Sequence, residues 1–283
     1  MRLLYKIGCL LLAGAILASC DDSVGDGIES TPLVVEGWID AGGAPVVLIS
    51  RTIAPSESMK DEAEILTKVV SYAKVRVSDG SRTVELKGQR NDDYFPPYIY
   101  TTDEMTGETG KSYRLEVDYP GINAWAETSI PEPWEVERFE VEVSAKTDSL
   151  YVLSAYIRNN PSGGNYYKFF TRVQGGGSCW NSSFLGLVDE RVFSDEVISV
   201  PVARGWGLLE KYRQPLFRKG EKVEVRFCTV NETTYNYWKG YDDITALARN
   251  VFFPVSENVP GNIHGALGLW AGYGASYYSV EIK

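Results

Sequence analysis

Histidine and methionine are scarce in this chain, which limits the chemistry that it can perform. The 283 residues hold one histidine, three methionines and four cysteines. The single histidine, His264, lies in a glycine-rich run, without partner residues at the spacing of a catalytic triad or a zinc site. We therefore expect a structural or incidental histidine, and we predict a non-enzymatic protein with no catalytic residues, no metal site and no cofactor.

Basic residues are also in the minority. The chain has 28 lysines and arginines against 38 acidic residues, a formal net charge of −10. Residues 1–19 contain two of the basic residues and no acidic one, so the charge without them is −12. No basic patch is evident in the sequence, which argues against nucleic acid as a partner. An acidic balance of this size favours the solubility of an exported protein but identifies no ligand.

The start of the chain has the layout of a cleaved export signal. Two basic residues precede an apolar run over residues 7–16, and small residues then lead to Cys20. The run is about half of the ~20 residues that a membrane-spanning helix needs, so we predict a signal peptide over residues 1–19. Leu17-Ala18-Ser19-Cys20 resembles a bacterial lipobox. On this interpretation Cys20 is acylated and anchors the protein to a membrane; an ordinary signal followed by a chance cysteine is the alternative.

The segment after Cys20 predicts a flexible tether. Residues 21–32, DDSVGDGIESTP in the one-letter code, are small, polar and acidic. They cannot bury an apolar core, so residues 20–32 should link the anchor to the folded part of the chain. Ser23 in this tether and Ser149 further along each follow an aspartate and precede an apolar residue. That pattern resembles an O-glycosylation motif, which makes both serines candidate modification sites.

The residues from 33 to 131 favour a β-sandwich. Aromatic residues make up 12% of the chain, and together with its β-branched residues they are typical of sheets. Apolar and polar residues alternate in this part, and Asp79-Gly80 is a strong signal for a type I′ hairpin turn. A two-residue loop at this position places Val75 opposite Val84. We predict an immunoglobulin-like sandwich of about seven short strands.

A proline-rich segment predicts a domain boundary. In Ile130-Pro131-Glu132-Pro133-Trp134, two prolines at alternate positions prefer an extended backbone and cannot join a central strand. Residues 134–283 then form a second antiparallel β-sandwich or barrel-like domain. One helix is predicted near residues 234–249, because apolar side chains recur there at helical spacing. That stripe consists of Tyr237, Tyr241, Ile244 and Ala248.

Two cysteines remain once Cys9 of the leader and Cys20 are set aside. Cys179 and Cys228 are expected in an oxidising compartment, where a disulfide persists. In residues 222–228 the apolar side chains share one face, and Cys228 lies on the charged face. The alternatives are a Cys179–Cys228 bridge or two separate thiols. A spacing of 49 residues between them matches no zinc site.

Aromatic residues close to expected loops are the best candidates for ligand contact. Tyr98 and Tyr100 belong to the aromatic run over residues 94–100, and Trp180 follows three consecutive glycines. Rings at these positions suit a flat contact with a sugar or a peptide. The alternative is that they cover the ends of the sandwich or pack between domains.

Several short segments, taken in order, resemble a known protein family. They are Val34-Val35-Glu36-Gly37, Ala73-Lys74-Val75, Ile130-Pro131, Gly164-Asn165-Tyr166-Tyr167 and the run NVPGNIHGALGLWAGY over residues 258–273. With the lipobox, they resemble a Bacteroidota lipoprotein family named "domain of unknown function 4249". The resemblance extends over nearly all of the chain after residue 19 and brings no catalytic residues with it.

The resemblance implies an outer-membrane lipoprotein, often encoded beside TonB-dependent transporters. Asp21 and Asp22 after Cys20 also resemble the signal that sends such lipoproteins to the cell surface. We therefore expect a non-enzymatic, lipid-anchored outer-membrane protein that faces outward and assists a TonB-dependent receptor, by capturing its substrate or by docking to it. A stand-alone glycan- or peptide-binding module is the alternative, and the sequence identifies no ligand.

Overall fold

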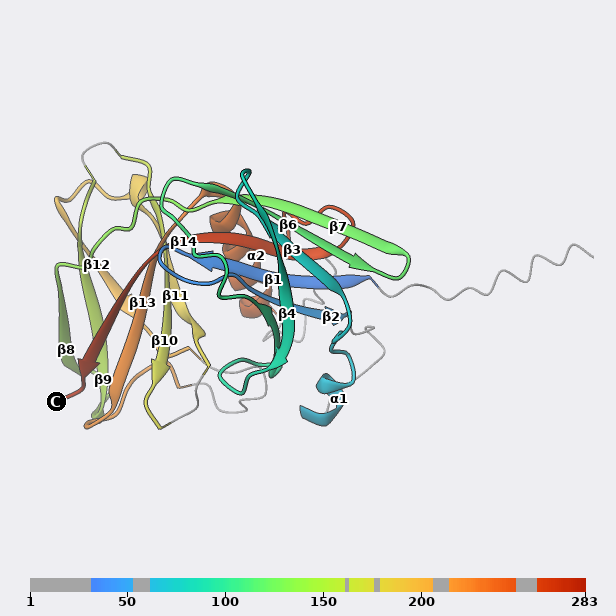
Figure 1. Cartoon of the computed structure of the whole chain (residues 1–283). Coiled ribbons are helices and arrows are strands. Elements are labelled where there is room, and N and C mark those ends of the chain that lie inside the picture. Colours follow the sequence, from blue (N-terminus) through green and yellow to red (C-terminus); the bar gives the residue numbers. More distant parts are fainter. Residues whose placement is uncertain (1–31, 53–61, 161–162, 176–178, 206–213, 248–258) are drawn as a thin grey trace, which may run out of the picture. The chain divides into compact units, whose positions relative to one another are not determined.

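The computed structural model describes residues 32–52, 62–160, 163–175, 179–205, 214–247 and 259–283, with helix residues 62 and 244–247 described by their backbone alone. Within these ranges the fold is mainly β, as predicted (Figure 1). Cys20, Ser23 and the predicted leader and tether up to residue 31 lie outside the described residues. Their roles stay predictions.

One large sheet contains eleven of the described strands, in the order β11-β10-β13-β14-β1-β2-β5-β4-β3-β6-β7. Alternation of buried and exposed side chains along strands such as β1 and β7 follows the two-residue repeat of the sequence. In chain order the strands of this sheet are β1 (Leu33–Asp40), β2 (Val46–Arg51), β3 (Lys74–Ser78), β4 (Thr83–Arg90), β5 (Tyr98–Thr101), β6 (Ser112–Tyr119), β7 (Ile122–Ser129), β10 (Tyr166–Val173), β11 (Asn181–Asp189), β13 (Lys222–Val230) and β14 (Leu267–Glu281).

A second sheet and a few short helices complete the described part of the chain. The three-stranded sheet has the order β12-β9-β8 and consists of β8 (Arg138–Ser144), β9 (Thr147–Arg158) and β12 (Val197–Val202). The helices are α1 (Glu62–Leu66), the 3₁₀ turn η1 (Glu190–Val192) and α2 (Glu232–Leu247). None of the described helices has the length and apolarity to cross a membrane.

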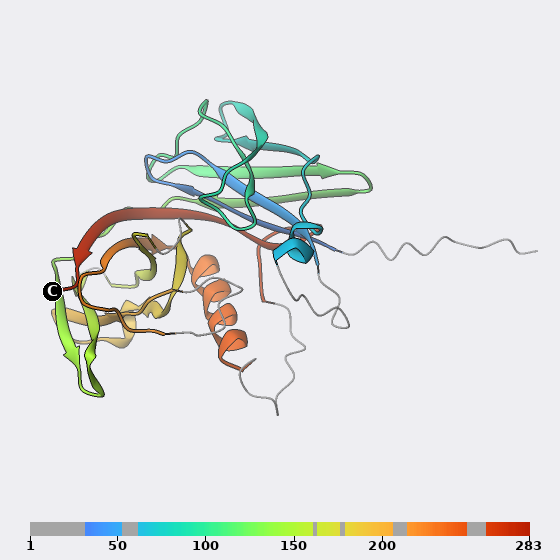
Figure 2. The ribbon, with the colours of Figure 1, turned by 90° about the horizontal axis from the view of Figure 1, so that it is seen from below.

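Strand β14 joins the two parts of the chain that the sequence divides at its prolines. Its first half pairs in parallel with β1, from Leu267 opposite Val34 to Tyr273 opposite Asp40. Its second half pairs antiparallel with β13, and Figure 2 shows the strand bending between the two. Residues Pro32–Lys283 accordingly form one compact unit. The predicted domain boundary between residues 131 and 134 stays a prediction. The structure adds that β14 pairs with a strand from each side of that boundary, β1 before it and β13 after it.

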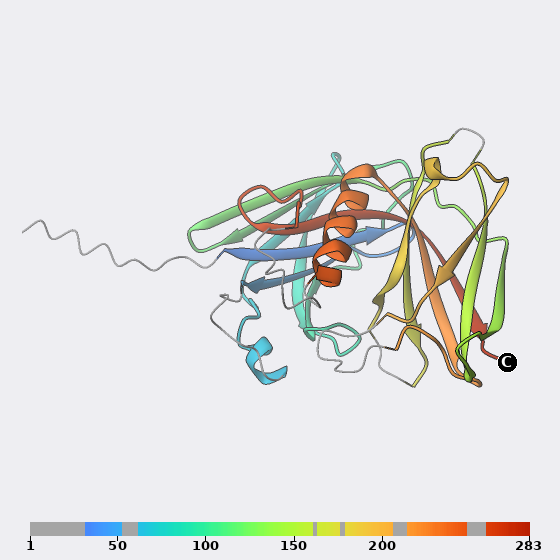
Figure 3. The ribbon, with the colours of Figure 1, turned by 180° about the vertical axis from the view of Figure 1, so that it is seen from behind.

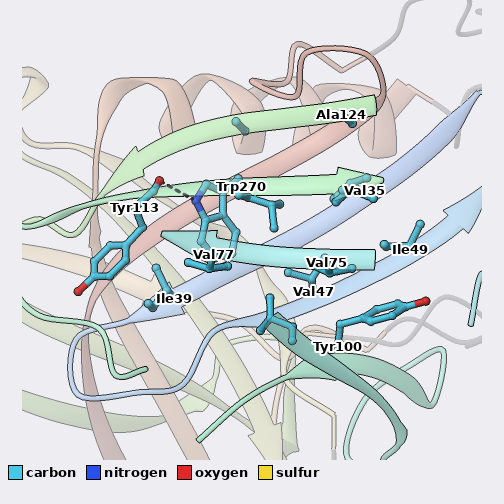
Figure 4. Close-up of a cluster of buried hydrophobic side chains, with 14 of the residues drawn as sticks. Val35, Ile39, Val47, Ile49, Val75, Val77, Tyr100, Tyr113, Ala124 and Trp270 are labelled. Atoms are coloured by element: carbon cyan, nitrogen blue, oxygen red, sulfur yellow. Dashed lines mark hydrogen bonds between the residues drawn. The ribbon is translucent and has the colours of Figure 1, made fainter. Parts of the chain in front are cut away.

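Two apolar clusters lie on the inner faces of the sheets. The first lies among strands β1 to β7 and includes Trp270 of β14, whose indole Nε1–H donates to the carbonyl oxygen of Tyr113 at 3.0 Å (Figure 4). The second lies between the three-stranded sheet and β10, β13 and β14, with Phe169, Phe217 and Phe227 fully buried. The second half therefore has the layers of a sandwich, which agrees with the first of the two predicted alternatives for this part.

The β3–β4 hairpin exists as predicted, but its register differs by two residues. Val75 pairs with Leu86, and Val77 pairs with Val84, so four residues from Asp79 to Arg82 form the loop. The Asp79 carboxylate accepts hydrogen bonds from the backbone N–H groups of residues 81 and 82 at 2.9 Å. The Ser81 hydroxyl also donates to this carboxylate, at 2.7 Å. The hydroxyl bond first, and then the two backbone bonds, lower the pKa of Asp79 to about 2, and together they stabilise the longer loop. A shift of two residues keeps each side chain on its predicted face.

Helix α2 begins two residues earlier than predicted and lies against the large sheet (Figure 3). Asn231 caps it, because its side-chain oxygen accepts from the backbone N–H of Thr234 at 2.9 Å. Trp238, which the predicted stripe omits, faces the sheet and is 8% exposed. The predicted Tyr237 packs against the same cluster and is half-buried, whereas Tyr241 is 40% exposed. The side chains of Ile244 and Ala248 lie outside the described residues.

The glycine-rich run after residue 260 allows the backbone to approach neighbouring strands closely. Gly268 has φ = +113°, and a Cβ atom there would lie 2.0 Å from the carbonyl oxygen of Val35. The side chain of Asn262 accepts from the backbone N–H of Trp270 and donates to its carbonyl oxygen, at 2.8 and 2.9 Å. These contacts fix the start of β14 beside β1.

Candidate functional site

The predicted aromatic contacts separate into buried and accessible residues. Tyr100 is 2% exposed, and its hydroxyl donates to the carbonyl oxygen of Val70 at 2.9 Å. Burial raises the pKa of Tyr100 to about 12. Tyr98 packs edge-on against it with ring centroids 5.7 Å apart, and its hydroxyl donates to the carbonyl oxygen of Ser71. The role predicted for Tyr100 is therefore wrong: it is a core residue, as in the packing alternative, and Tyr98 supports it.

Trp180 is half-buried and packs against the buried cluster that contains Cys228. It lies at the centre of a group that we call the Trp180 cluster: Arg172, Gln174, Trp180, Glu224 and Tyr277. The Arg172 guanidinium lies 4.7 Å from the Trp180 ring centroid. Tyr277 packs edge-on against the same ring at 5.8 Å and keeps 55% of its surface exposed. Two aromatic rings and a cation thus form one surface patch.

Sheet register explains why these side chains meet. Arg172 of β10 lies opposite Glu224 of β13, and Tyr277 of β14 lies opposite Arg226 of β13. Side chains of directly paired residues lie on the same face of a sheet. The Arg172 Nε–H donates to Glu224 at 2.6 Å, and the Gln174 amide donates to the other carboxylate oxygen at 3.0 Å. These two contacts lower the pKa of Glu224, with the Gln174 bond the larger cause.

A buried ion pair lies beneath the cluster. Arg226 is 4% exposed and pairs with the carboxylate of Asp40 at the end of β1. The Tyr277 hydroxyl donates to the other Asp40 oxygen at 2.6 Å. The rings of Tyr273 and Phe170 lie 4.7 and 5.0 Å from the Arg226 guanidinium. The exposed ring of Tyr277 is thus fixed in position through its hydroxyl, which is bound to the carboxylate of the buried Asp40–Arg226 pair.

Aromatic side chains continue the same face beyond Asp40. Trp38, two residues earlier on β1, has its ring 5.8 Å from the Arg226 guanidinium. Tyr94 from the β4–β5 loop lies 5.9 Å from Trp38, ring to ring. Desolvation raises the pKa of Tyr94. The Trp180 cluster therefore borders a larger aromatic face formed by β1, β13 and β14.

Cys179 and Cys228 lie in different surroundings. No disulfide joins Cys179 and Cys228 in the described part of the chain. Cys228 is fully buried in a cluster with Trp238 of α2. Helix α2 thus covers the face of β13 that the sequence predicts to be charged. Burial raises the pKa of the Cys228 thiol to about 12. Cys179 lies in the loop before β11 and is half-buried.

His264 takes part in a local contact with β7. Its backbone exchanges two hydrogen bonds with Trp125, at 2.8 and 3.0 Å, and its ring stacks on the indole at 4.1 Å. Arg114 lies over the same indole at 4.2 Å. Among the described residues, no group of three or more histidine, cysteine or acidic side chains is arranged to hold a metal ion.

Ser149 lies exposed near the start of β9, at the edge of a hollow of about 580 Å³. Its hydroxyl lies 3.0 Å from that of Thr147. The hollow is lined by Asp148, Ser149, Leu150, Tyr151, Gln214, Arg218 and Lys219. The predicted modification of Ser149 stays a prediction.

Comparison of the sequence with models of known protein families identifies the family of this chain. The family model of the domain of unknown function DUF4249 matches residues 21–278. The chain belongs to this family. No curated protein sequence matches it. The predicted relationship is thus confirmed, and the family description assigns no activity to its members.

Sequence reasoning found Trp180 but missed its partners. Tyr277 and Asp40 are 237 residues apart in the chain, and Arg226 reaches them from a third strand. One signal was present: Arg226 interrupts the apolar end of β13, VEVRFCTV, next to two buried residues. A charge within such a run indicates a buried partner.

Proposed function

We propose that this DUF4249 protein is a non-enzymatic lipoprotein of the bacterial outer membrane. Acyl chains on Cys20 anchor it, it faces the cell surface, and it assists a TonB-dependent transporter by capturing the transporter's substrate. The observation that carries the proposal is the Trp180 cluster, an accessible aromatic patch with hydrogen-bonding groups in fixed positions.

The cluster combines the features that favour ligand binding. Aromatic faces contribute apolar contact area, and a few fixed polar groups orient a ligand. The Tyr277 ring is exposed while its hydroxyl is bound to Asp40, and the Arg172 guanidinium is bound to Glu224. Binding to side chains that are already immobilised costs less conformational entropy than binding to mobile ones. The patch is therefore suited to recognising a sugar or peptide surface.

The charges of the cluster support binding rather than catalysis. A general acid or base is most effective with a pKa close to the working pH. Here the Gln174 and Arg172 contacts lower the pKa of Glu224, and desolvation raises the pKa of Tyr277. Both shifts move the group away from neutral pH, so neither residue is suited to proton transfer.

The distance between the anchor and the fold supports action at the membrane surface. The described fold begins at residue 32, twelve residues beyond Cys20. A flexible chain of this length has a root-mean-square reach of about 20 Å. Anchoring two partners in one membrane raises their effective concentration, so a weak interface with a transporter suffices.

Metabolic labelling and protease treatment test the anchor and its orientation. A palmitate analogue should label the wild-type protein and leave Cys20→Ala unlabelled, and equal labelling of both would contradict the anchor. Protease added to intact cells should cleave the protein. Protection in whole cells together with cleavage after lysis would place it on the inner leaflet.

A stand-alone glycan- or peptide-binding module is the second candidate, and the exposed Tyr277 ring beside the half-buried Trp180 favours it equally. Glycan and peptide arrays with wild type and Trp180→Ala separate binding at the cluster from binding elsewhere. Trp125→Ala is the matched control, because Trp125 is also a partly exposed indole with an arginine over it. A ligand bound in isolation, with no transporter recovered in pull-downs, selects this candidate.

A further inference from the structure

A second candidate binding site lies outside the Trp180 cluster, where β9 meets the segment before β13. Tyr151 and Phe217 exchange two backbone hydrogen bonds, at 2.8 and 3.0 Å. Phe217 is fully buried, which fixes the backbone on both sides of this pairing. Residues on both sides of the pairing, Tyr151 and Arg218 among them, line the hollow of about 580 Å³ described above. Small-molecule sites have volumes of about 300–1,000 Å³.

Two adjacent cations, Arg218 and Lys219, line this hollow. Arg218 and Lys219 are both exposed, and neither forms an ion pair with another described residue. Most arginines of the described chain do form one, including the neighbouring Arg204, which pairs with Glu221. In a chain of net charge −10, two adjacent cations in a concave surface, with no ion pair to another described residue, favour an anionic ligand.

The remaining polar groups of the hollow indicate that this ligand also carries hydroxyls. The Gln214 carbonyl oxygen accepts from the backbone N–H of Leu216 at 3.0 Å, which orients the amide and leaves its NH₂ group to donate. Asp148 adds an acceptor and Ser149 a hydroxyl, while the half-buried Tyr151 adds an aromatic side chain. The ionised Asp148 carboxylate can only accept hydrogen bonds. A ligand whose anion binds to Arg218 and Lys219 must therefore carry hydrogen-bond donors where it meets Asp148.

We propose that this hollow binds an acidic saccharide of the uronic acid type. Its carboxylate lies against Arg218 and Lys219, since a guanidinium matches a carboxylate in geometry and charge. Its ring hydroxyls bond to Asp148, Ser149 and Gln214. A sugar acid supplies the anion and the neighbouring donors in one residue, whereas an acidic peptide supplies a second carboxylate close to Asp148. The assignment does not depend on the Trp180 cluster or on a transporter.

Binding of short uronic acid oligomers to the full-length protein in detergent tests this proposal. The probes are oligomers of galacturonate, glucuronate and guluronate, with maltotriose as the neutral sugar and triglutamate as the acidic peptide. We expect one of the uronates to bind, at least tenfold more tightly than maltotriose or triglutamate. Raising the salt concentration should weaken this binding, because the site is exposed.

Variants of equal charge identify the site. Arg218→Gln with Lys219→Gln should weaken uronate binding at least tenfold and leave the far-ultraviolet circular dichroism spectrum unchanged. Lys87→Gln with Lys239→Gln removes the same charge from two exposed lysines outside the hollow and should bind as wild type does. Three results would overturn the proposal: no uronate binds to wild type, both double variants lose affinity equally, or triglutamate binds as tightly as the best uronate.

Discussion

The buried pair of Arg226 and Asp40 provides the sharpest test of how the sheet is held together. Asp40 belongs to β1, Arg226 to β13, and Tyr277 of β14 donates to the same carboxylate. Asp40→Asn keeps the shape and one acceptor but removes the charge that faces the guanidinium. Arg226 then keeps its charge at 4% exposure, among rings that give it no negative partner.

The expected loss follows from the cost of an unpaired buried charge. Removing one partner of a buried ion pair costs about 3–5 kcal/mol. That is a large share of the roughly 5–15 kcal/mol by which a native protein is stable. Removing both charges, in Asp40→Asn with Arg226→Met, leaves no uncompensated ion, so the double variant should lose less than Asp40→Asn alone.

Urea unfolding followed by tryptophan fluorescence measures these differences, with the denaturant midpoint and slope reported for each variant. The control is Asp92→Asn, because Asp92 pairs with Arg90 at the surface with side chains 74% and 76% exposed. An exposed pair of this kind contributes about 0–1 kcal/mol. If Asp40→Asn and Asp92→Asn cost the same, or if the losses from Asp40→Asn and Arg226→Met simply add, the pair does not hold the strands together as argued.

Three further predictions concern a buried ion pair, a close backbone approach and a buried thiol. Asp242→Asn should lower the free energy of unfolding at neutral pH, because Lys168 is fully buried and its ammonium lies 3.2 Å from Asp242. Burial lowers the pKa of Lys168 from its usual 10.5, so Lys168 loses its charge before the pH reaches that value. The decrease in unfolding free energy caused by Asp242→Asn should therefore become smaller as the pH rises. A decrease that stays constant up to pH 10.5 would contradict this prediction. Gly268→Ala should lower the midpoint of thermal unfolding more than Gly80→Ala does. Both glycines have positive φ, but only Gly268 has a carbonyl oxygen 2.0 Å from the new Cβ. Equal decreases would refute the close approach. Cys228 should resist iodoacetamide in the native protein and react after unfolding in urea, since burial raises the pKa of its thiol to about 12. Rapid labelling of the native protein would contradict this burial.

Local patterns in the sequence were sufficient to predict the mainly β fold and the β3–β4 hairpin, because a period of two and a turn signal act within a few residues. They did not predict β5, β11 or the first half of β14. The register was missed because the Asp79 side chain closes a four-residue loop, which the Asp79-Gly80 pair alone does not distinguish from a two-residue loop. The parallel pairing of β1 with β14 joins segments more than two hundred residues apart, and no local pattern encodes it.

The same limit applies to the candidate site. Trp180 was identified from its glycine-rich surroundings, but Tyr100 has the same aromatic chemistry and is buried. Accessibility depends on which face of the sheet a strand presents and on what covers that face. Register between β10, β13 and β14 brings Arg172, Glu224 and Tyr277 together, and that register is a property of the folded sheet.

Co-purification from native outer membranes tests the central claim most directly. The full-length protein with a C-terminal tag, solubilised in mild detergent, should recover a TonB-dependent receptor, whereas Cys20→Ala should recover much less because it lacks the anchor. Receptor recovery with wild type, together with its loss in Cys20→Ala, is the result that the account predicts. Wild-type protein that is found in the outer membrane but never recovers a receptor would contradict the accessory role.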